Sequence, residues 1–282
     1  PLGMGNNTLT VRATDNRGLS ATLPLTIRRE NAQQAYQPPK QHQQYSKGTL
    51  GANDKRIALV IGNSDYQNGG SLRNPVNDAR AMEKTLRALG FEVMKYENSS
   101  LGGMKRAIDD FGQRLKNYDV GLFFYAGHGV QVDGKNYLIP IDASLMNEND
   151  VDYDCVRADR ALAKMEAAGA ATNIVMLDAC RNNPFERSWS RSVGGAGQGL
   201  AFMNAPSGSL IAYATAPGNT ASDGTGNNGL YTSAVLRHIN TPGITIEEVF
   251  KRVRATVMEE SAGRQTPWES TSLTGDFHFK LP

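Results

Sequence analysis

Short runs of apolar residues recur along the chain from residue 55 onward, separated by segments that carry apolar residues at helical spacing. Each run is too short for a helix and lacks strict polar alternation, which is typical of strands buried on both faces of a sheet. The predicted strands are residues 56–62, 91–96, 119–125, 172–177, 209–215 and, at the end, 276–280. A hairpin through Asp133-Gly134 adds a further strand pair after the third run.

The intervening segments predict helices, because their apolar residues return every three or four positions. Asn74-Pro75 supplies an N-cap and a first helical residue, and Gly90 ends that helix. The expected helices are residues 75–89, 101–117, 157–167, 230–239 and 246–260. Alternating strands and helices predict an α/β fold, with a mostly parallel sheet flanked by helices on both faces.

The first 54 residues follow a different pattern. Residues 6–28 alternate as two strands around a turn at residues 15–18, so they predict a β-hairpin. We interpret residues 1–30 as the last two strands of an immunoglobulin-like module whose earlier strands precede this sequence, with Pro1-Leu2-Gly3 as an expression scar. Residues 31–54 are rich in glutamine and proline and predict a linker, which leaves residues 55–282 as the main domain.

Composition excludes some classes of function. The chain is 39% hydrophobic and 21% charged, with a net charge of +2 and no block of basic residues. These values give no reason to expect nucleic acid or a membrane as a partner. We expect a monomer. The sequence does not decide the cellular compartment, since an exported and a cytoplasmic protein both fit it.

Two of the predicted buried strands end in residues that can do chemistry. Residues 119–125 lead into Ala126-Gly127-His128-Gly129, and residues 172–177 lead into Asp178-Ala179-Cys180-Arg181. The histidine precedes the cysteine by 52 residues, counted from positions 128 and 180. In parallel sheets the carboxyl ends of the strands carry the reactive groups, so we expect an imidazole and a thiol to meet there.

These motifs resemble those of the caspase-like cysteine peptidases, and specifically the bacterial metacaspase or orthocaspase branch. The resemblance covers roughly residues 55–282 and includes the opening strand to Asn63, the Asn77-Asp78 step and residues 213–218. It implies the caspase-like α/β fold and a cysteine endopeptidase. By resemblance His128 is the base, Cys180 is the nucleophile, and the backbone amides of Gly129 and Cys180 form the oxyanion hole. No cofactor is implied.

The resemblance also bears on specificity. Caspases carry glutamine and glycine where this chain has Asp178 and Asn182, and metacaspase-like proteins place carboxylates that attract arginine or lysine. We therefore expect protein or peptide substrates with Arg or Lys before the scissile bond. Asn74-Pro75 departs from the Gly-Cys that many metacaspases have there. The candidate substrate-binding residues are Asp78, Asp178, Asp142, Asp223, Tyr213, Ala214 and Thr215.

The segment that follows the candidate nucleophile predicts self-processing. Residues 181–207 are long, rich in glycine and polar residues, and carry Arg187 and Arg191. Such loops are cut readily because their backbone can adopt the extended conformation that a peptidase needs. We expect cleavage after Arg187 or Arg191; the alternative is that these arginines only keep a loop soluble.

Other interpretations stay open at this point. Cys155 follows two aspartates that disfavour a thiolate, so we interpret it as non-catalytic. The acidic residues Glu148, Asp150, Asp152 and Asp154 do not fit a helix-loop-helix calcium loop, and a solvated acidic loop is favoured over calcium dependence, with no metal site expected. The alternative function is a catalytically silent caspase-like module that only binds partners.

Overall fold

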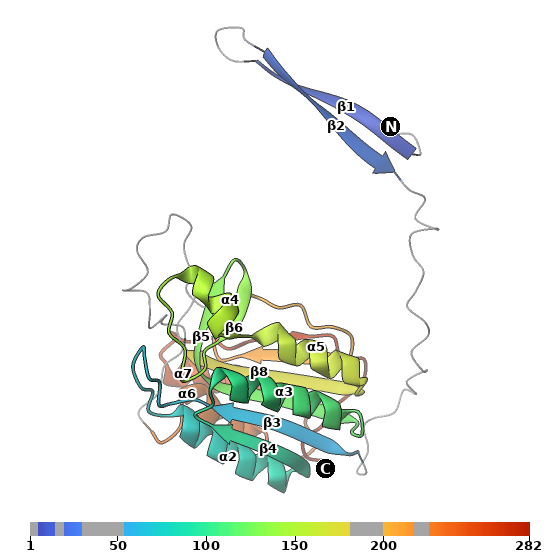
Figure 1. Cartoon of the computed structure of the whole chain (residues 1–282). Coiled ribbons are helices and arrows are strands. Elements are labelled where there is room, and N and C mark those ends of the chain that lie inside the picture. The colour runs from blue at the N-terminus through green and yellow to red at the C-terminus, as the bar shows by residue number, and fades with distance from the viewer. Residues whose placement is uncertain (1–4, 15–19, 30–53, 181–199, 217–225) are drawn as a thin grey trace. The chain divides into compact units, whose positions relative to one another are not determined.

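The structure is a computed structural model that describes residues 5–14, 20–29, 54–180, 200–216 and 226–282 (Figure 1). It divides into two units, residues 1–46 and residues 47–282. The first holds an antiparallel hairpin of β1 (Gly5–Thr14) and β2 (Ser20–Arg29), in which Thr8 lies opposite Thr26. The predicted hairpin is therefore present, and its assignment to an immunoglobulin-like module stays a prediction.

The second unit is built on one eight-stranded sheet, which the sequence pattern predicted in outline. The order is β10-β9-β8-β5-β3-β4, with β6 and β7 continuing from β5. The neighbouring strands β4, β3, β5, β8 and β9 are all parallel to one another. The strand β10 is antiparallel to β9, and β6 is antiparallel to β5. The strands are β3 (Arg56–Gly62), β4 (Phe91–Glu97), β5 (Val120–Val132), β6 (Lys135–Leu138), β7 (Val156–Arg157), β8 (Thr172–Cys180), β9 (Ser209–Tyr213) and β10 (Trp268–Thr271).

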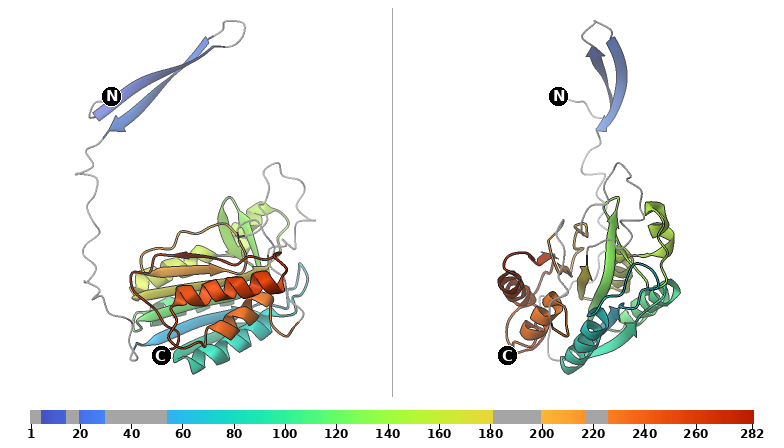
Figure 2. Two further views of the ribbon diagram at one scale, coloured as in Figure 1. Left: turned by 180° about the vertical axis from the view of Figure 1, so that it is seen from behind. Right: turned by 90° about the vertical axis from the view of Figure 1, so that its left-hand side faces the viewer.

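Helices cover both faces of this sheet, as Figure 2 shows in its right-hand view. They are α2 (Pro75–Ala88), α3 (Leu101–Leu115), α4 (Val151–Asp154), α5 (Ala158–Ala168), α6 (Leu230–His238) and α7 (Ile246–Glu260), with a 3₁₀ turn η1 (Glu148–Asp150) before α4. None of the helices in the described ranges is long and apolar enough to cross a bilayer.

The central strands are apolar throughout because each face has its own helix layer. Alternate residues of β3 point to opposite faces. Val60 packs with α2, α6 and α7 in one buried cluster, and Ile61 packs with α3 and α5 in another. Both side chains are completely buried. The uninterrupted apolar run is thus explained by burial on two sides, and the parallel, doubly covered sheet places this unit in the α/β class.

The strand register fixes where the carboxyl ends of the sheet meet. Gly62 at the end of β3 lies beside Ala126 of β5, and Ala126 lies beside Asp178 of β8. One residue earlier in β8, Leu177 lies beside Tyr213, the last residue of β9. The segments that follow these strands therefore open on the same edge of the sheet.

Some expected elements differ from the structure. The strand predicted over residues 276–280 is wrong: this segment has no ladder, although Phe277 and Phe279 bury their rings and mimic strand alternation. The last strand is instead β10, which the sequence did not indicate. Asn74 precedes α2 as expected, but its side chain makes no cap hydrogen bond.

Candidate active site

His128 lies within β5, at the last position where that strand pairs with β8. Its register partner there is Cys180, the last residue of β8. Parallel neighbours are roughly 4.8 Å apart, so the fold brings together two residues that are far apart in sequence. The sequence predicted that this strand ends at Tyr125, whereas β5 continues to Val132 because it leaves β8 and pairs with β6.

The imidazole of His128 is buried, with 5% of the residue exposed. The ring of Tyr66 packs against it at 4.5 Å between centroids and an interplanar angle of 50°. Nε2 lies 3.3 Å from the carbonyl oxygen of Gly70. Because a carbonyl can only accept, Nε2 carries the proton in the neutral ring, which leaves the buried Nδ1 as the basic nitrogen.

The backbone around the histidine depends on Gly127. Its φ is 154°, in a region that residues with a side chain rarely adopt. A Cβ at this position would lie 2.6 Å from the Tyr66 hydroxyl and 2.7 Å from the Tyr125 hydroxyl. Only glycine therefore fits between the two tyrosines.

Asp78 occupies the first turn of α2 and is 3% exposed. Its Oδ1 accepts hydrogen bonds from the Asn228 side-chain amide and from the backbone N–H of Gly229, both at 2.9 Å. The predicted position at the start of a helix is correct, but α2 is not the only element that holds the Asp78 side chain. The carboxylate is held by the segment that enters α6, which is 150 residues away in sequence.

Asp178 reaches the same segment from β8. Thr232, in the first turn of α6, donates its hydroxyl to Asp178 Oδ2 at 2.6 Å. A Cβ on Gly229 would lie 3.2 Å from Asp78 Oδ2 and 3.4 Å from Asp178 Oδ2. The two predicted carboxylates therefore converge on one point at the start of α6, on the sheet edge that also holds His128.

Tyr213, Ala214 and Thr215 follow this edge at the end of β9. The Tyr213 hydroxyl accepts from the backbone N–H of Met203 at 3.0 Å, and the N–H of Ala214 bonds to the carbonyl of Leu177. Thr215 is 1% exposed. These contacts fix the strand end beside β8, and a contact of these residues with substrate stays a prediction.

Asp142 has a structural partner. Its exposed carboxylate accepts from the backbone N–H of Leu101 at 2.8 Å and so caps the start of α3. The predicted residues Asp223, Arg187 and Arg191 lie outside the described residues. The backbone of Cys180 ends β8, and Gly129 continues β5 directly after the histidine.

The second cysteine is buried, and two residues of the acidic run make structural hydrogen bonds. Cys155 is 3% exposed, and burial raises the pKa of its thiol well above the usual range, with Asp154 adding to the effect. Asp150 closes a capping box on η1 with Asn147, and Asp152 accepts from the Tyr137 hydroxyl at 2.5 Å. Within the described part of the chain no group of three His, Cys, Asp or Glu residues is arranged to hold a metal.

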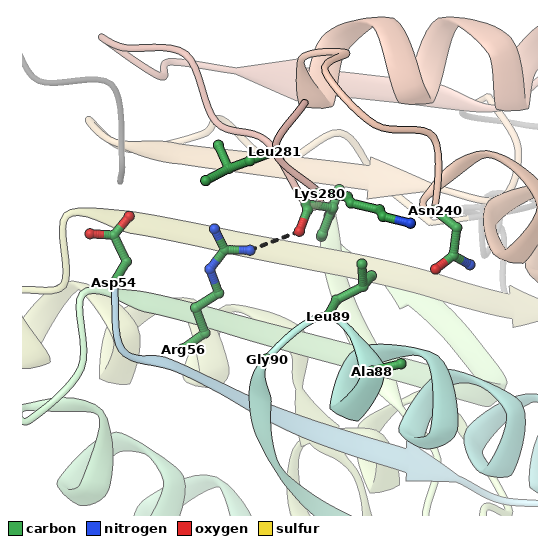
Figure 3. A pocket seen from close by; sticks show the side chains of 9 residues that line it. Asp54, Arg56, Ala88, Leu89, Gly90, Asn240, Lys280 and Leu281 are labelled. Atoms are coloured by element: carbon green, nitrogen blue, oxygen red, sulfur yellow. Dashed lines mark hydrogen bonds between the residues drawn. The ribbon is translucent and has the colours of Figure 1, made fainter. Parts of the chain in front are cut away.

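One of the pockets lies far from this chemistry. It has a volume of about 400 Å³ and surrounds the side chain of Arg56 at the amino end of β3, so it opens on the opposite edge of the sheet (Figure 3). Arg56 donates to the carbonyl of Phe279 at 2.9 Å and lies over the rings of Phe91 and Phe277. Since its guanidinium is engaged in packing and none of the predicted site residues lines the pocket, we give it no catalytic role.

The chain belongs to the caspase family: the profile described as "Caspase domain" matches residues 55–278. Among solved structures, caspase-1 from Spodoptera frugiperda aligns with a TM-score of 0.59 over 82% of this chain and 92% of that chain, at 18% identity. This likeness confirms the caspase-like fold, and the family is one of cysteine peptidases.

Curated relatives share part of the domain. The chain is 32% identical over 130 residues to human mucosa-associated lymphoid tissue lymphoma translocation protein 1, covering 46% of this chain and 15% of that protein. It is 28% identical over 136 residues to caspase b of Danio rerio, covering 46% of this chain and 32% of the relative. The chain thus spans a third or less of these two relatives' length.

The sequence missed several residues that shape the site. Tyr66 and Gly70 come from the segment after β3, which has no periodicity and no motif. Asn228 and Thr232 lie at a helix start that was predicted, but the pattern gave no sign that they would meet Asp78 and Asp178. Contacts between distant segments of this kind depend on the tertiary fold alone.

Proposed function

We propose that the chain is a cysteine endopeptidase that hydrolyses peptide bonds after arginine or lysine, with Cys180 as nucleophile and His128 as general base and acid. The convergence of Asp78 and Asp178 on Gly229 carries this proposal, because these two carboxylates lie on the edge where the pairing of β5 with β8 ends. The presence of Asp178 where caspases have glutamine supports a place in the metacaspase or orthocaspase branch.

The reaction follows from the groups at this edge. The Cys180 thiol transfers its proton to Nδ1 of His128, and the thiolate adds to the substrate carbonyl carbon. The carbonyl oxygen then carries a negative charge, which the backbone amides of Gly129 and Cys180 stabilise. The imidazolium returns the proton to the leaving amine as the C–N bond breaks, and water hydrolyses the thioester.

Specificity follows from charge. Two carboxylates that share one site repel each other, and a cation between them removes the repulsion. A guanidinium offers five N–H donors in a planar fork, and it can bond to both carboxylates at once, whereas an ammonium acts as a point charge. An aspartate side chain of a substrate would be repelled by the same pair, so the proposal predicts no preference for acidic residues.

We also propose that the protein cleaves itself after Arg187 or Arg191. The support comes from the sequence, since both arginines lie in the polar segment that joins β8 to β9. Leu177 of β8 is paired with Tyr213 of β9, so the two fragments would stay joined through the sheet. Incubating the wild type beside Cys180→Ala and sequencing the new amino termini tests this: equal fragments in both would indicate a contaminating protease, and no fragments in either would refute self-processing.

Replacing the two catalytic residues tests the proposed chemistry. Cys180→Ala and His128→Ala should each abolish turnover of an arginine peptide, and the double variant should lose little more, because the pair acts as a unit. Unchanged melting temperatures would show that the fold survives. If either single variant keeps wild-type turnover, the assignment is wrong, and if the wild type itself has no turnover, the catalytically silent module becomes the better account.

A further inference from the structure

The peptide that joins His128 to Gly129 is held in one orientation by two donors. The carbonyl oxygen of His128 accepts from the backbone N–H of Ile139 at 3.1 Å and from the Tyr125 hydroxyl at 2.8 Å. This peptide is trans, so its N–H, which belongs to Gly129, points in the opposite direction to the carbonyl. The carbonyl faces the extension of β6, and the Gly129 N–H therefore faces away from it.

Tyr125 contacts this peptide but none of the reacting groups. It is completely buried and belongs to β5. Its hydroxyl lies 3.0 Å from the carbonyl of Ile139 and 3.4 Å from the hydroxyl of Tyr66. The Tyr66 hydroxyl in turn accepts from the backbone N–H of His128 at 2.7 Å. The two tyrosines thus bind the amide group on one side of His128 and the carbonyl on the other.

This arrangement bears on the oxyanion. A donor on a peptide carbonyl polarises the amide and makes its N–H a stronger donor, and the effect is larger where water is excluded. Donors that stabilise an oxyanion work best when their direction is fixed before the reaction. Gly127 permits this fixing, since a Cβ there would collide with both hydroxyls.

We infer that Tyr125 is a positioning residue for the oxyanion hole: its hydroxyl holds the His128–Gly129 peptide so that the Gly129 N–H points at the substrate carbonyl oxygen. This inference rests on the proposed function. Tyr125 touches neither substrate nor the reacting atoms, and it acts through the peptide of its third neighbour in sequence.

The test is Tyr125→Phe, which keeps the ring and removes only the hydroxyl. Hydrolysis of an arginine peptide substrate should fall by roughly threefold to tenfold in kcat with little change in KM, the loss expected for one hydrogen bond. Removing an oxyanion donor outright costs about 100-fold to 1,000-fold, so a smaller loss is the mark of an indirect role. Affinity for an arginine peptide aldehyde, which forms a tetrahedral adduct with the thiol, should fall in parallel.

Alkylation by iodoacetamide distinguishes a change in the oxyanion hole from a general disturbance of the active-site structure. This reaction consumes the same thiolate but develops no oxyanion, so Tyr125→Phe should be alkylated at the wild-type rate. Tyr137→Phe is the matched control, because it removes another buried tyrosine hydroxyl, one that bonds to Asp152 instead of His128. Its kcat should equal that of the wild type. If Tyr125→Phe proves unstable, kcat and the alkylation rate are measured at a temperature at which the variant stays folded.

Three outcomes would overturn the inference. An active wild type whose kcat is unchanged by Tyr125→Phe refutes it and leaves the proposed function intact. Equal losses in hydrolysis and alkylation would show a structural role only. A wild type that neither hydrolyses the peptide nor binds the aldehyde refutes the proposed function, and this inference with it.

Discussion

Replacing Asp178 by asparagine tests the charge pairing with substrate most sharply. The variant keeps the size of the side chain and an acceptor oxygen for the Thr232 hydroxyl, which lies 2.6 Å from Oδ2. What it removes is the negative charge. The matching change in the substrate is a peptide with citrulline in place of arginine, which also loses its charge.

The magnitude follows from burial and distance. Two unit charges 4 Å apart interact by about 4 kcal/mol at an effective dielectric constant of 20, which suits a half-buried group such as Asp178. Truncating one partner of a desolvated charge pair costs roughly 2–5 kcal/mol. We thus expect kcat/KM on the arginine substrate to fall by roughly 30-fold to several thousand-fold, since 1.36 kcal/mol is tenfold.

The assay is a double-mutant cycle of wild type and Asp178→Asn against arginine and citrulline peptides. Asp178→Asn should affect the citrulline peptide far less than the arginine peptide, with a coupling energy of at least about 2 kcal/mol. Asp109→Asn is the control: this surface carboxylate of α3 pairs with Arg160 and Lys164 of α5, and its loss should leave kcat/KM unchanged. Equal losses on both peptides would show that Asp178 does not pair with the substrate cation.

Three further predictions concern the groups around the site and the sheet. Thr232→Val should lower kcat/KM on arginine peptides by roughly twofold to tenfold, and Thr232→Ser should restore it, because only the valine leaves Asp178 without this donor. Glu97 has its pKa lowered from 4.5 to about 2, chiefly by the bond from Arg80. Its stabilisation should be full above pH 4.5 and lost as the pH falls toward about 2, so Glu97→Gln should cost up to about 1 kcal/mol at pH 7 and little at pH 2 in denaturant titrations. Cys155 should resist iodoacetamide in the folded protein because burial raises its pKa, and mass spectrometry that finds both thiols modified at equal rates would contradict this.

The sequence predicted the sheet and its helices because their residues carry a strong local signal. Val60 and Ile61 are both apolar since each face of β3 is covered, and this pattern is visible without a structure. The segment over residues 276–280 shows the limit of this reasoning. Phe277 and Phe279 alternate like strand residues, but the Phe277 carbonyl accepts from the backbone N–H of Ile246 and the Phe279 carbonyl accepts from the Arg56 side chain, so neither belongs to a strand ladder.

The reactive residues of the candidate site could be predicted from the sequence, but the residues that hold them in place could not. His128 and Cys180 stand in motifs whose residue types indicate a thiol and a base, and the register confirms that they are neighbours in the sheet. Nothing local marks Tyr66 as the ring that packs on His128, because that contact joins a loop to a strand 62 residues later. Side-chain contacts over such separations are decided by packing.

Hydrolysis of a matched set of fluorogenic peptides tests the nucleophile and the substrate preference together. The set has Arg, Lys, Asp or Ala before the scissile bond, and each peptide is incubated with wild type and with Cys180→Ala. The proposed function predicts cleavage after Arg and Lys by the wild type alone, with Asp and Ala peptides uncut. Preferential cleavage after Asp, or equal cleavage by Cys180→Ala, would contradict it.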